Sequence, residues 1–455
     1  MKTTSKRVAL GAALCVLASA ASVQAATFIV QTNGNGLSQA QLTRLAAAGG
    51  TVRANLPQIG LAVVDADAGF AARAAGISGL RSVTADIRMQ FDVPDALVQD
   101  EGAPNFANPP NSGEDDTRFD LEWGMKAIDA AGAWNVGARG AGAVVAVLDS
   151  GIVCQHADIA PNLLPNSTSF VPGENVCHDI PGVFNHGTHV AGIIAAADNA
   201  FGTIGVAPQA KILAVKVLSG VTGSGEFAGI IQGIVYAADQ GANVINMSLG
   251  VTDGLPKGGA ETAELINATK RAVQYAQARN VLIVASAGND ARDLDHDANT
   301  VAFPAQLPGV LAVSATAPEA WGHDLNGANL DLPASYTNYG QSAVHFAGPG
   351  GDFDYAGNED CTIAGLVRPC WVFDGVFAPG GYTVPNGNLY FWASGTSMAA
   401  PHVSGVAALI FGKYPGIKAQ KVEQILRQSA DDLGKPGKDD FYGQGRVNAA
   451  KAVAN

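Results

Sequence analysis

Short runs of consecutive apolar residues recur through the chain after residue 120, and helical patterns lie between or after them. The apolar runs span residues 143–148, 212–217, 244–247, 281–285 and 310–314. The helical patterns span residues 227–239, 261–279 and 418–429. Buried strands that alternate with helices are typical of a parallel sheet covered on both faces. The pattern therefore predicts an α/β fold that binds its ligand at the carboxyl ends of the strands.

Residues 26–91 carry a different pattern and form a separate unit. Extended and helical stretches follow one another in the order strand, helix, strand, strand, helix, strand. The helical stretches are residues 38–48 and about 68–75. This order predicts a small α+β domain ahead of the α/β domain.

Two further segments lack apolar periodicity. Residues 92–120 hold eight acidic residues and four prolines, which predicts a solvated linker open to proteolysis. Composition does not distinguish a plain spacer from a processing site. Residues 319–391 are rich in Gly, Pro, Asn and Asp, and we expect surface loops of an insertion there. The α/β domain then covers residues 121–455.

The first 25 residues have the composition of an export signal. Lys2, Lys6 and Arg7 precede an apolar run over residues 8–22, and small residues follow at 23–25. The alternative is a membrane anchor, but the run is shorter than the roughly 20 residues that a spanning helix needs. We therefore expect a secreted protein that is not bound to the membrane.

Removal of this signal would leave four cysteines, which allow three disulfide connectivities. We expect Cys154–Cys177 and Cys361–Cys370, because each pair lies within one loop region. An oxidising destination favours disulfides over metal thiolates.

The overall composition narrows the classes of partner. Of 455 residues, 47% are hydrophobic and only 15% are charged, which suits a tightly packed globular protein. The net charge of -13 argues against nucleic acid as a partner and favours cationic polypeptides. Nothing in the sequence requires more than a monomer.

Ser397 stands where Gly395-Thr-Ser leads into an Ala-rich helical segment. A serine at a helix start can be a simple cap. Its backbone N–H also belongs to the unpaired donors of the first turn, which favour a developing negative charge. Ser397 is therefore either a cap or a nucleophile, and the rest of the chain decides between them.

Two further motifs supply an acid and a base. Asp149 directly follows the first buried strand, and His186 stands where the helix after Asn185 would begin. His186 and His189 are three residues apart, so a zinc site is an alternative. However, the Glu and the second His at i+4 of a zinc-protease helix are missing.

Asn289 lies in the segment Ser286-Ala-Gly-Asn that follows the strand over residues 281–285. It could donate its amide to an oxyanion, although a Gly-Asn turn is the simpler alternative. A nucleophilic serine needs a base, a carboxylate that orients the base, and donors for the oxyanion. Asp149, His186, Asn289 and the N–H of Ser397 are chemically suited to those roles. Their joint occurrence favours the nucleophile.

These four motifs, Asp149-Ser-Gly, His186-Gly-Thr-His-Val-Ala-Gly, Ser286-Ala-Gly-Asn and Gly395-Thr-Ser-Met-Ala-Ala-Pro-His, resemble those of the subtilisin-like serine proteases in kind and order. The resemblance covers nearly everything after about residue 119. It implies a three-layer sandwich with a mainly parallel sheet, and a serine endopeptidase that works through an acyl-enzyme. Residues 26–91 resemble the family's inhibitory prosegment, which assists folding and is then removed in the 92–120 linker.

The resemblance also implies binding residues. Two segments would hold the substrate peptide as an added strand, and two residues would lie at the primary side-chain pocket: Gly223, Ser224, Gly225, Ser248, Leu249, Gly250, Asp290 and Ala302. Asp290 would favour a basic substrate residue, and Ala302 would make the pocket shallower than Gly would. A structural calcium ion is implied at five residues: Asp158, Ala197, Asn199, Phe201 and Thr203. No organic cofactor is expected.

Two other functions are weighed against this one. A catalytically silent relative would bind peptides without cutting them, but the intact set of Asp, His and Ser argues against it. An α/β-hydrolase esterase would carry Gly-x-Ser-x-Gly and the order Ser, Asp, His. This chain has neither that motif nor that order.

Overall fold

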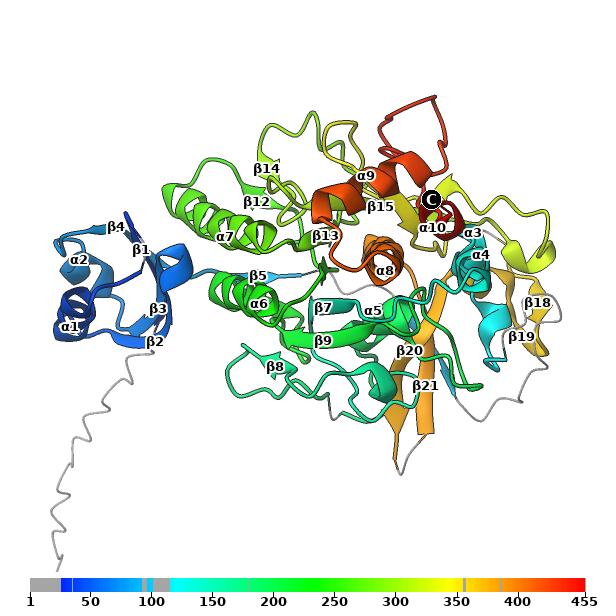
Figure 1. Ribbon diagram of the computed structural model, residues 1–455, viewed down its shortest axis with the longest axis horizontal. Coiled ribbons are helices and arrows are strands. Elements are labelled where there is room, and N and C mark those ends of the chain that lie inside the picture. Colours follow the sequence, from blue (N-terminus) through cyan, green and yellow to red (C-terminus); the bar gives the residue numbers. More distant parts are fainter. Residues whose placement is uncertain are drawn as a thin grey trace, which may run out of the picture.

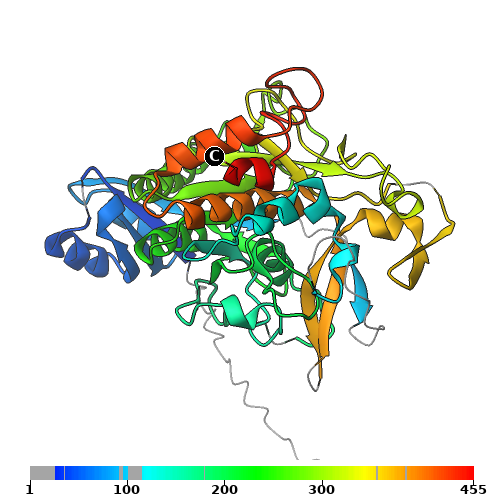
Figure 2. The same cartoon turned by 45° about the vertical axis from the view of Figure 1, so that its right-hand side comes forward.

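The computed structural model describes residues 26–34, 36–91, 96–100, 115–178, 180–354, 357–384 and 387–454, with the backbone alone for residues 97–100. The predicted export signal lies outside the described residues. The chain forms an N-terminal domain (residues 26–91) and a main domain (residues 115–454), which lie side by side in Figures 1 and 2. None of the described helices has the length and apolarity needed to cross a membrane.

The N-terminal domain is a four-stranded antiparallel sheet with two helices. Its elements are β1 Ala26–Thr32, α1 Gln39–Ala47, β2 Thr51–Leu56, β3 Leu61–Ala66, α2 Phe70–Ala74 and β4 Leu80–Ala85, with strand order β2-β3-β1-β4. A capping box between Ser38 and Gln41 fixes the start of α1. Phe28, Leu45 and Phe70 form a small core of its own. The element order is the one expected from the sequence.

A mainly parallel sheet runs through the main domain (Figure 1). Its order is β16-β15-β13-β11-β7-β9-β8, with β17 also paired to β15, and only β16 runs antiparallel. The bounds are β7 Val144–Asp149, β8 Thr168–Ser169, β9 Lys211–Lys216, β11 Val244–Met247, β13 Leu282–Ser286, β15 Leu311–Ala317, β16 Leu332–Pro333 and β17 Phe346–Pro349. The five apolar runs of the sequence are all strands of this sheet.

Helices cover both faces of the sheet because alternate strand residues point to opposite sides. Val145 and Val147 of β7 share one core with α5 and α8, whereas Ala146 and Leu148 share the other with α6 and α7. The helices are α3 Trp123–Ala127, α4 Ala130–Asn135, α5 His186–Ala195, α6 Phe227–Asp239, α7 Ala260–Ala278, α8 Thr396–Lys413, α9 Ala419–Ser429 and α10 Ala449–Val453. The predicted α/β class and its three layers are confirmed.

Smaller sheets surround the central sheet. Three are two-stranded: β5 Arg88–Gln90 with β10 Ser224–Glu226, β12 Leu255–Pro256 with β14 Thr300–Val301, and β18 Asp360–Ile363 with β19 Leu366–Pro369. A fourth has three strands in the order β20 Val376–Thr383, β21 Gly387–Ala393 and β6 Ala96–Asp100. Short 3-10 turns connect other segments: η1 Pro57–Ile59, η2 Phe119–Leu121, η3 Ala160–Asn162, η4 Trp321–His323 and η5 Cys370–Asp374. Both expected disulfides, Cys154–Cys177 and Cys361–Cys370, are present.

Two expectations about irregular segments are wrong in part. Residues 319–391 are not all surface loops, because β17 joins the central sheet and β20–β21 forms a hairpin whose large side chains are buried. The segment 92–120 is not wholly a solvated linker, because β6 is a paired strand and Asp116 and Arg118 are buried. Neither feature was visible in the sequence, because Gly, Pro and polar residues interrupt these segments. Backbone pairing and the burial of single polar side chains leave no apolar periodicity.

Candidate active site

Asp149 is the last residue of β7 and His186 is the first residue of α5. The Asn185 side chain caps α5 by accepting the N–H of Thr188 at 2.8 Å. Gly187 allows the start of the helix to approach the end of the strand. A Cβ atom at Gly187 would lie 2.2 Å from the carbonyl oxygen of Gly151 and 3.1 Å from the Cβ of Asp149. Glycine at this position therefore sets the distance between the acid and the base.

The Asp149 carboxylate holds the imidazole of His186. The Nδ1 of His186 lies 2.8 Å from Oδ1 and 3.0 Å from Oδ2 of Asp149, and the N–H of Ser150 donates to Oδ1 at 2.6 Å. Because a carboxylate only accepts, Nδ1 carries the proton and Nε2 is left as an acceptor. Nε2 is buried without a hydrogen-bond partner among the described residues. This arrangement provides a base with a free lone pair.

Ser397 is the second residue of α8 and is tied to Ser248. Its hydroxyl donates to the carbonyl oxygen of Ser248 at 3.3 Å. Pro401, one turn later, has no N–H for the Ser397 carbonyl, which instead accepts the hydroxyl of Ser248 at 2.7 Å. Within the described residues, Ser397 and His186 are not hydrogen-bonded to each other. Such catalytic hydrogen bonds often form only when substrate is bound.

Asn289 follows β13 and is oriented by the residue before Ser397. Its Oδ1 accepts the backbone N–H of Thr396 at 2.9 Å and the Thr396 hydroxyl at 2.8 Å. These two bonds fix the amide, so its nitrogen remains available as a donor. Asn289 and Ser397 thus share one corner of the site, as the sequence predicted from their places at a strand end and a helix start.

His189, the second histidine of the motif, is buried and bonded to the backbone of β21. The Nε2 of His189 lies 3.0 Å from the carbonyl oxygen of Phe391. Burial lowers the pKa of His189 to about 3, so its ring is neutral at physiological pH. His186 and His189 therefore contact different partners, and the arrangement does not favour the zinc alternative.

Residues 88–91 contact one of the two segments expected to hold a peptide, and they also contact the residues that directly follow the other. Strand β10, which contains Ser224 and Gly225, pairs antiparallel with β5. Phe91 forms a bridge with Val251, and the N–H of Thr252 donates to the carbonyl oxygen of Gln90 at 3.2 Å. Gly223 precedes β10, and Ser248, Leu249 and Gly250 lead into the second segment. Both segments can therefore bind an extended chain.

Asp290 and Ala302 line a small cavity beside Gly250, with a volume of about 10 Å³. The Asp290 carboxylate accepts a hydrogen bond from Asn338 at 3.3 Å and lies 3.9 Å from the Arg292 guanidinium. Arg292 also contacts Asp297. Sequence reasoning missed Arg292, because a charge two residues beyond the motif gives no sign that it turns toward the same cavity.

A group of buried carboxylates lies near the expected calcium ligands. Asp158 accepts from the N–H of Thr203 at 3.0 Å, but its Oδ1 is buried without a hydrogen-bond partner. The Oδ2 of Asp116 is likewise buried without a hydrogen-bond partner among the described residues. Burial raises the pKa of Asp158 and that of Asp116 to about 7, and the charge of Asp158 adds to the second shift. Glu122, fully buried, has its pKa raised by burial and by both aspartates.

The other four expected ligands lie on the loop beside these acids. Asn199 is exposed and its amide donates to the carbonyl oxygen of Ala157 at 3.4 Å, whereas Ala197 and Thr203 are buried and Phe201 is partly buried. The N–H of Asn199 also donates to Asp116 at 3.3 Å. Asp116 was missed from the sequence, because it lies in the segment interpreted as a linker. Two orphaned carboxylate oxygens suit a hard cation with oxygen ligands.

Comparisons with known proteins agree with this geometry. The model of the subtilase family matches residues 140–445, more than half of the chain. The chain belongs to the subtilase family. It is 38% identical over 333 residues to a thermostable alkaline protease of Halalkalibacterium halodurans, covering 73% of each protein. It is 34% identical over 336 residues to subtilisin DY of Bacillus licheniformis, covering 73% of this chain and 98% of that protein.

Solved structures of subtilases have the same fold. A lanthipeptide protease is 30% identical, with a TM-score of 0.59 over 73% of this chain and 95% of that chain. An epidermin leader peptide processing serine protease from Staphylococcus aureus has a TM-score of 0.70 and covers 95% of this chain and 99% of that chain. At 23% identity, this second likeness concerns the fold alone. The chain is therefore a subtilase serine protease that acts on polypeptides.

Proposed function

We propose that this subtilase is a secreted endopeptidase, made as a zymogen, in which Asp149, His186 and Ser397 form the catalytic triad. The observation that carries the proposal is the Asp149–His186 pair, which leaves Nε2 as an acceptor. His186 begins α5, which packs against α8, the helix that begins with Thr396 and Ser397. His186 would take the proton of the Ser397 hydroxyl as its oxygen attacks the peptide carbonyl carbon. Asp149 would stabilise the imidazolium and keep its orientation.

The rest of the reaction follows from the same groups. The tetrahedral oxyanion would accept hydrogen bonds from the Asn289 amide and the Ser397 N–H. His186 would then return its proton to the leaving amine, which leaves the peptide acyl group on Ser397. Water, deprotonated by the same imidazole, would hydrolyse this acyl-enzyme and release the serine.

Labelling with a fluorophosphonate tests the proposed nucleophile. After removal of the N-terminal domain, we expect stoichiometric labelling of wild-type protein at Ser397 and none of a Ser397→Ala variant. Mass spectrometry of the labelled peptide identifies the residue. Labelling at another serine, or none in processed protein, would contradict the proposal.

We propose that Gly223, Ser224 and Gly225 bind one edge of an extended substrate, and Ser248, Leu249 and Gly250 the other. Residues 88–90 already pair with β10 as an added strand, and Phe91 forms a bridge with Val251, the residue after Gly250. Asp290 and Ala302 would then contact the substrate side chain before the scissile bond. Arg292 offsets part of the charge of Asp290, and Asn338 donates a hydrogen bond to its carboxylate, so the preference for a basic side chain expected from the sequence loses part of its physical basis.

An Arg292→Ala substitution should restore that preference. Without the guanidinium, the carboxylate of Asp290 would face the pocket as an uncompensated charge, and the removed side chain would enlarge the pocket. We expect the ratio of kcat/KM for Lys over Ala at this substrate position to rise about tenfold. Peptides that differ only at this residue measure it, with Arg279→Ala as a control far from the pocket. An unchanged ratio would show that Arg292 does not mask Asp290.

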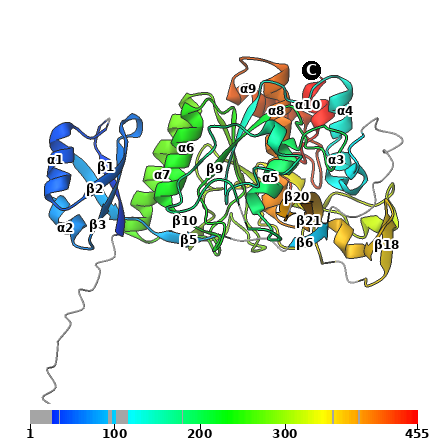
Figure 3. The ribbon, with the colours of Figure 1, turned by 90° about the horizontal axis from the view of Figure 1, so that it is seen from below.

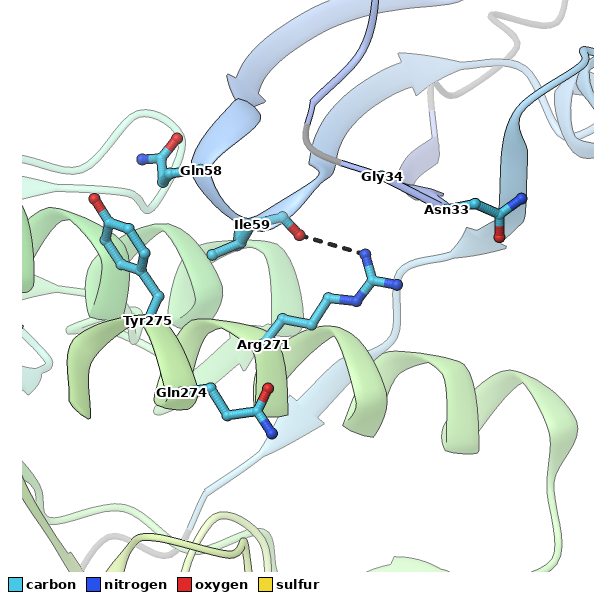
Figure 4. Close-up of a pocket in the computed structure, with 7 residues that line it drawn as sticks. All are labelled: Asn33, Gly34, Gln58, Ile59, Arg271, Gln274 and Tyr275. Atoms are coloured by element: carbon cyan, nitrogen blue, oxygen red, sulfur yellow. Dashed lines mark hydrogen bonds between the residues drawn. The ribbon is translucent and has the colours of Figure 1, made fainter. Parts of the chain in front are cut away.

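We infer that residues 26–91 are an inhibitory prosegment. Strand β5 pairs with β10 and Phe91 forms a bridge with Val251. Arg271 of α7 donates to the carbonyl oxygen of Thr32 at 3.2 Å and to that of Ile59 at 3.3 Å, and Figure 4 shows the second of these bonds. Glu264 of α7 accepts from Gln31 at 2.9 Å. The prosegment would thus cover the site and pack on α6 and α7. Release would follow cleavage within residues 92–120.

Asp86 of the prosegment caps the start of α6 across this interface. The first N–H groups of α6, those of Phe227 and Ala228, donate to its carboxylate at 3.1 and 2.9 Å. Glu226, the cap residue of α6 itself, makes no side-chain bond there. Loss of a cap costs about 1 kcal/mol. An Asp86→Ala prosegment should therefore inhibit the processed enzyme about fivefold more weakly.

Inhibition constants of the isolated wild-type and variant prosegments measure this change. Asp67→Ala, on the same domain but bonded to Arg73 within it, is the matched control. Equal inhibition by the Asp86→Ala and wild-type prosegments would show that the capping contact adds nothing to the affinity.

We also propose a structural Ca²⁺ site that involves Asp116, Asp158 and Asn199, with the backbone carbonyls of Ala197, Phe201 and Thr203. The oxygens Asp116 Oδ2 and Asp158 Oδ1, which have no hydrogen-bond partner among the described residues, support it, because buried carboxylates are costly unless positive charge and donors compensate them. A bound divalent cation would supply that charge and anchor the start of the main domain to the loop at residues 197–203.

Removal of calcium should lower the melting temperature of the protein. With free Ca²⁺ at about 100 times its Kd, binding contributes about 2.7 kcal/mol, and excess chelator removes this. Asp116→Asn should abolish most of the calcium-dependent shift, whereas Asp253→Asn, at an exposed carboxylate elsewhere, should leave it intact. Identical melting curves with calcium and with chelator would exclude the site.

The proposal of secretion depends on residues 1–25 and on the two disulfides, which form in oxidising compartments. Expression of the full chain in a secreting host, followed by amino-terminal sequencing of the exported protein, tests it. We expect a new terminus close to residue 26. Retention of the protein inside the cell with residues 1–25 attached would contradict it.

A further inference from the structure

Strand β6 lies on an edge of the main domain that the proposed reaction does not yet use. β21 pairs with β20 on one side and with β6 on the other. The five residues of β6 run antiparallel to β21, from Ala96 opposite Ala393 to Asp100 opposite Leu389. Pairing of this kind depends on main-chain N–H and C=O groups, so the edge can accept many sequences.

The edge begins beside the proposed nucleophile. Ala393, at the start of the β6 pairing, is four residues before Ser397 in the chain. Phe91 forms a bridge with Val251, three residues after Ser248, which is hydrogen-bonded to Ser397. Figure 3 shows β5 beside β10 and β6 beside β21 as separate contacts along the same side of the molecule.

β5 and β6, in that order along the chain, therefore pair with β10 and with β21. The chain runs along β10 from Arg88 to Gln90, and then along β21 from Ala96 to Asp100. A polypeptide placed in this direction has its amino-side residues on β10 and its carboxyl-side residues on β21. β6 thus marks a path for the part of a substrate that follows the scissile bond.

β21 is packed into the main domain through its side chains and through β20. Tyr390 and Trp392 of β21 are fully buried, and the ring of Phe377 on β20 packs against both, with centroids 5.6 and 4.6 Å away. The outer edge of β20 is already used, because the N–H of Asn185 donates to the carbonyl oxygen of Gly380 at 2.7 Å. This contact also joins the hairpin to the residue before His186.

We propose that the β21 edge, from Ala393 to Leu389, binds the carboxyl-side segment of a polypeptide substrate as an added antiparallel strand once β6 has left it. The inference rests on the proposed endopeptidase function and deepens it. The substrate class is an extended polypeptide with at least five ordered residues after the scissile bond, a length of about 17 Å. Folded chains that expose only a short loop would be cut slowly.

Quenched fluorescent peptides test the edge. All share one sequence up to the scissile bond and carry two, four, six or eight residues after it. With processed enzyme, we expect kcat/KM to rise about tenfold from two to six residues and then to level off. A tail of six D-residues of the same composition, the matched control, should give no gain. N-methylation at alternate positions should remove the gain in one register and keep it in the other.

Two results separate the possible failures. Equal kcat/KM for all four lengths would contradict substrate binding along β21 and would leave the proposed endopeptidase function unaffected. Failure to cut any of the peptides would overturn both. A peptide with the sequence of residues 96–100 should also inhibit cleavage of the eight-residue substrate but not of the two-residue substrate. Equal inhibition of the two would contradict binding along β21.

Discussion

Replacement of Ser397 by Ala is expected to reduce kcat for peptide hydrolysis by about 10⁶, the loss found for the corresponding serine in subtilisin itself. The change removes only the attacking oxygen. The Ser397 carbonyl would still accept the Ser248 hydroxyl, and α8 would keep its buried packing, so the fold should be retained. Initial rates on a chromogenic peptide, at matched concentrations of protein with native melting temperature, measure the loss.

The same variant should fail to mature. Residues 88–91 lie in the peptide-binding segments of the chain's own main domain, so processing by its own active site requires the serine. We expect intact mass spectrometry to find residues 26–91 still attached. Ser429→Ala, which removes a buried helical hydroxyl bonded to the Ile425 carbonyl, is the control and should mature normally. Normal activity or normal maturation of Ser397→Ala would refute the assignment.

Asp149→Asn is expected to lower kcat by about 10⁴ with little change in KM, as in the serine protease triad generally. In this structure the reason is specific. The N–H of Ser150 donates to Oδ1 at 2.6 Å and would select the amide oxygen of the new side chain. The amide nitrogen would then face His186 Nδ1, which must become the acceptor. The proton would move to Nε2, and the ring could no longer accept the proton of Ser397.

Rates of fluorophosphonate labelling and of peptide hydrolysis should fall together in this variant, because both need the base. Asp129→Asn is a suitable control, since Asp129 caps α4 through a bond to Gly132 and Asn is an equally good cap. An Asp149→Asn enzyme within tenfold of the wild-type kcat would contradict the role of the carboxylate.

The sequence determined the parts of this protein that depend on local pattern. Apolar runs of four to six residues marked the strands of the parallel sheet, because a strand covered on both faces must be apolar throughout. Motif order placed Asp149, His186, Asn289 and Ser397 at strand ends and helix starts, where parallel topology brings side chains to one edge. Short sequence separation made the two disulfides predictable, since closure of a short loop is easily met.

The tertiary structure alone decided the contacts between segments far apart in the chain. Asp116 reaches the loop at residues 197–203, Arg292 turns toward Asp290, and β6 pairs with β21. None of these contacts leaves a periodic or compositional signal. Each needs only one polar side chain or one strand edge, and the neighbouring residues can be of any kind. The sequence therefore determined which chemical groups the site contains, whereas the fold determined which charged groups face Asp290 and Asp116 and which strand lies along β21.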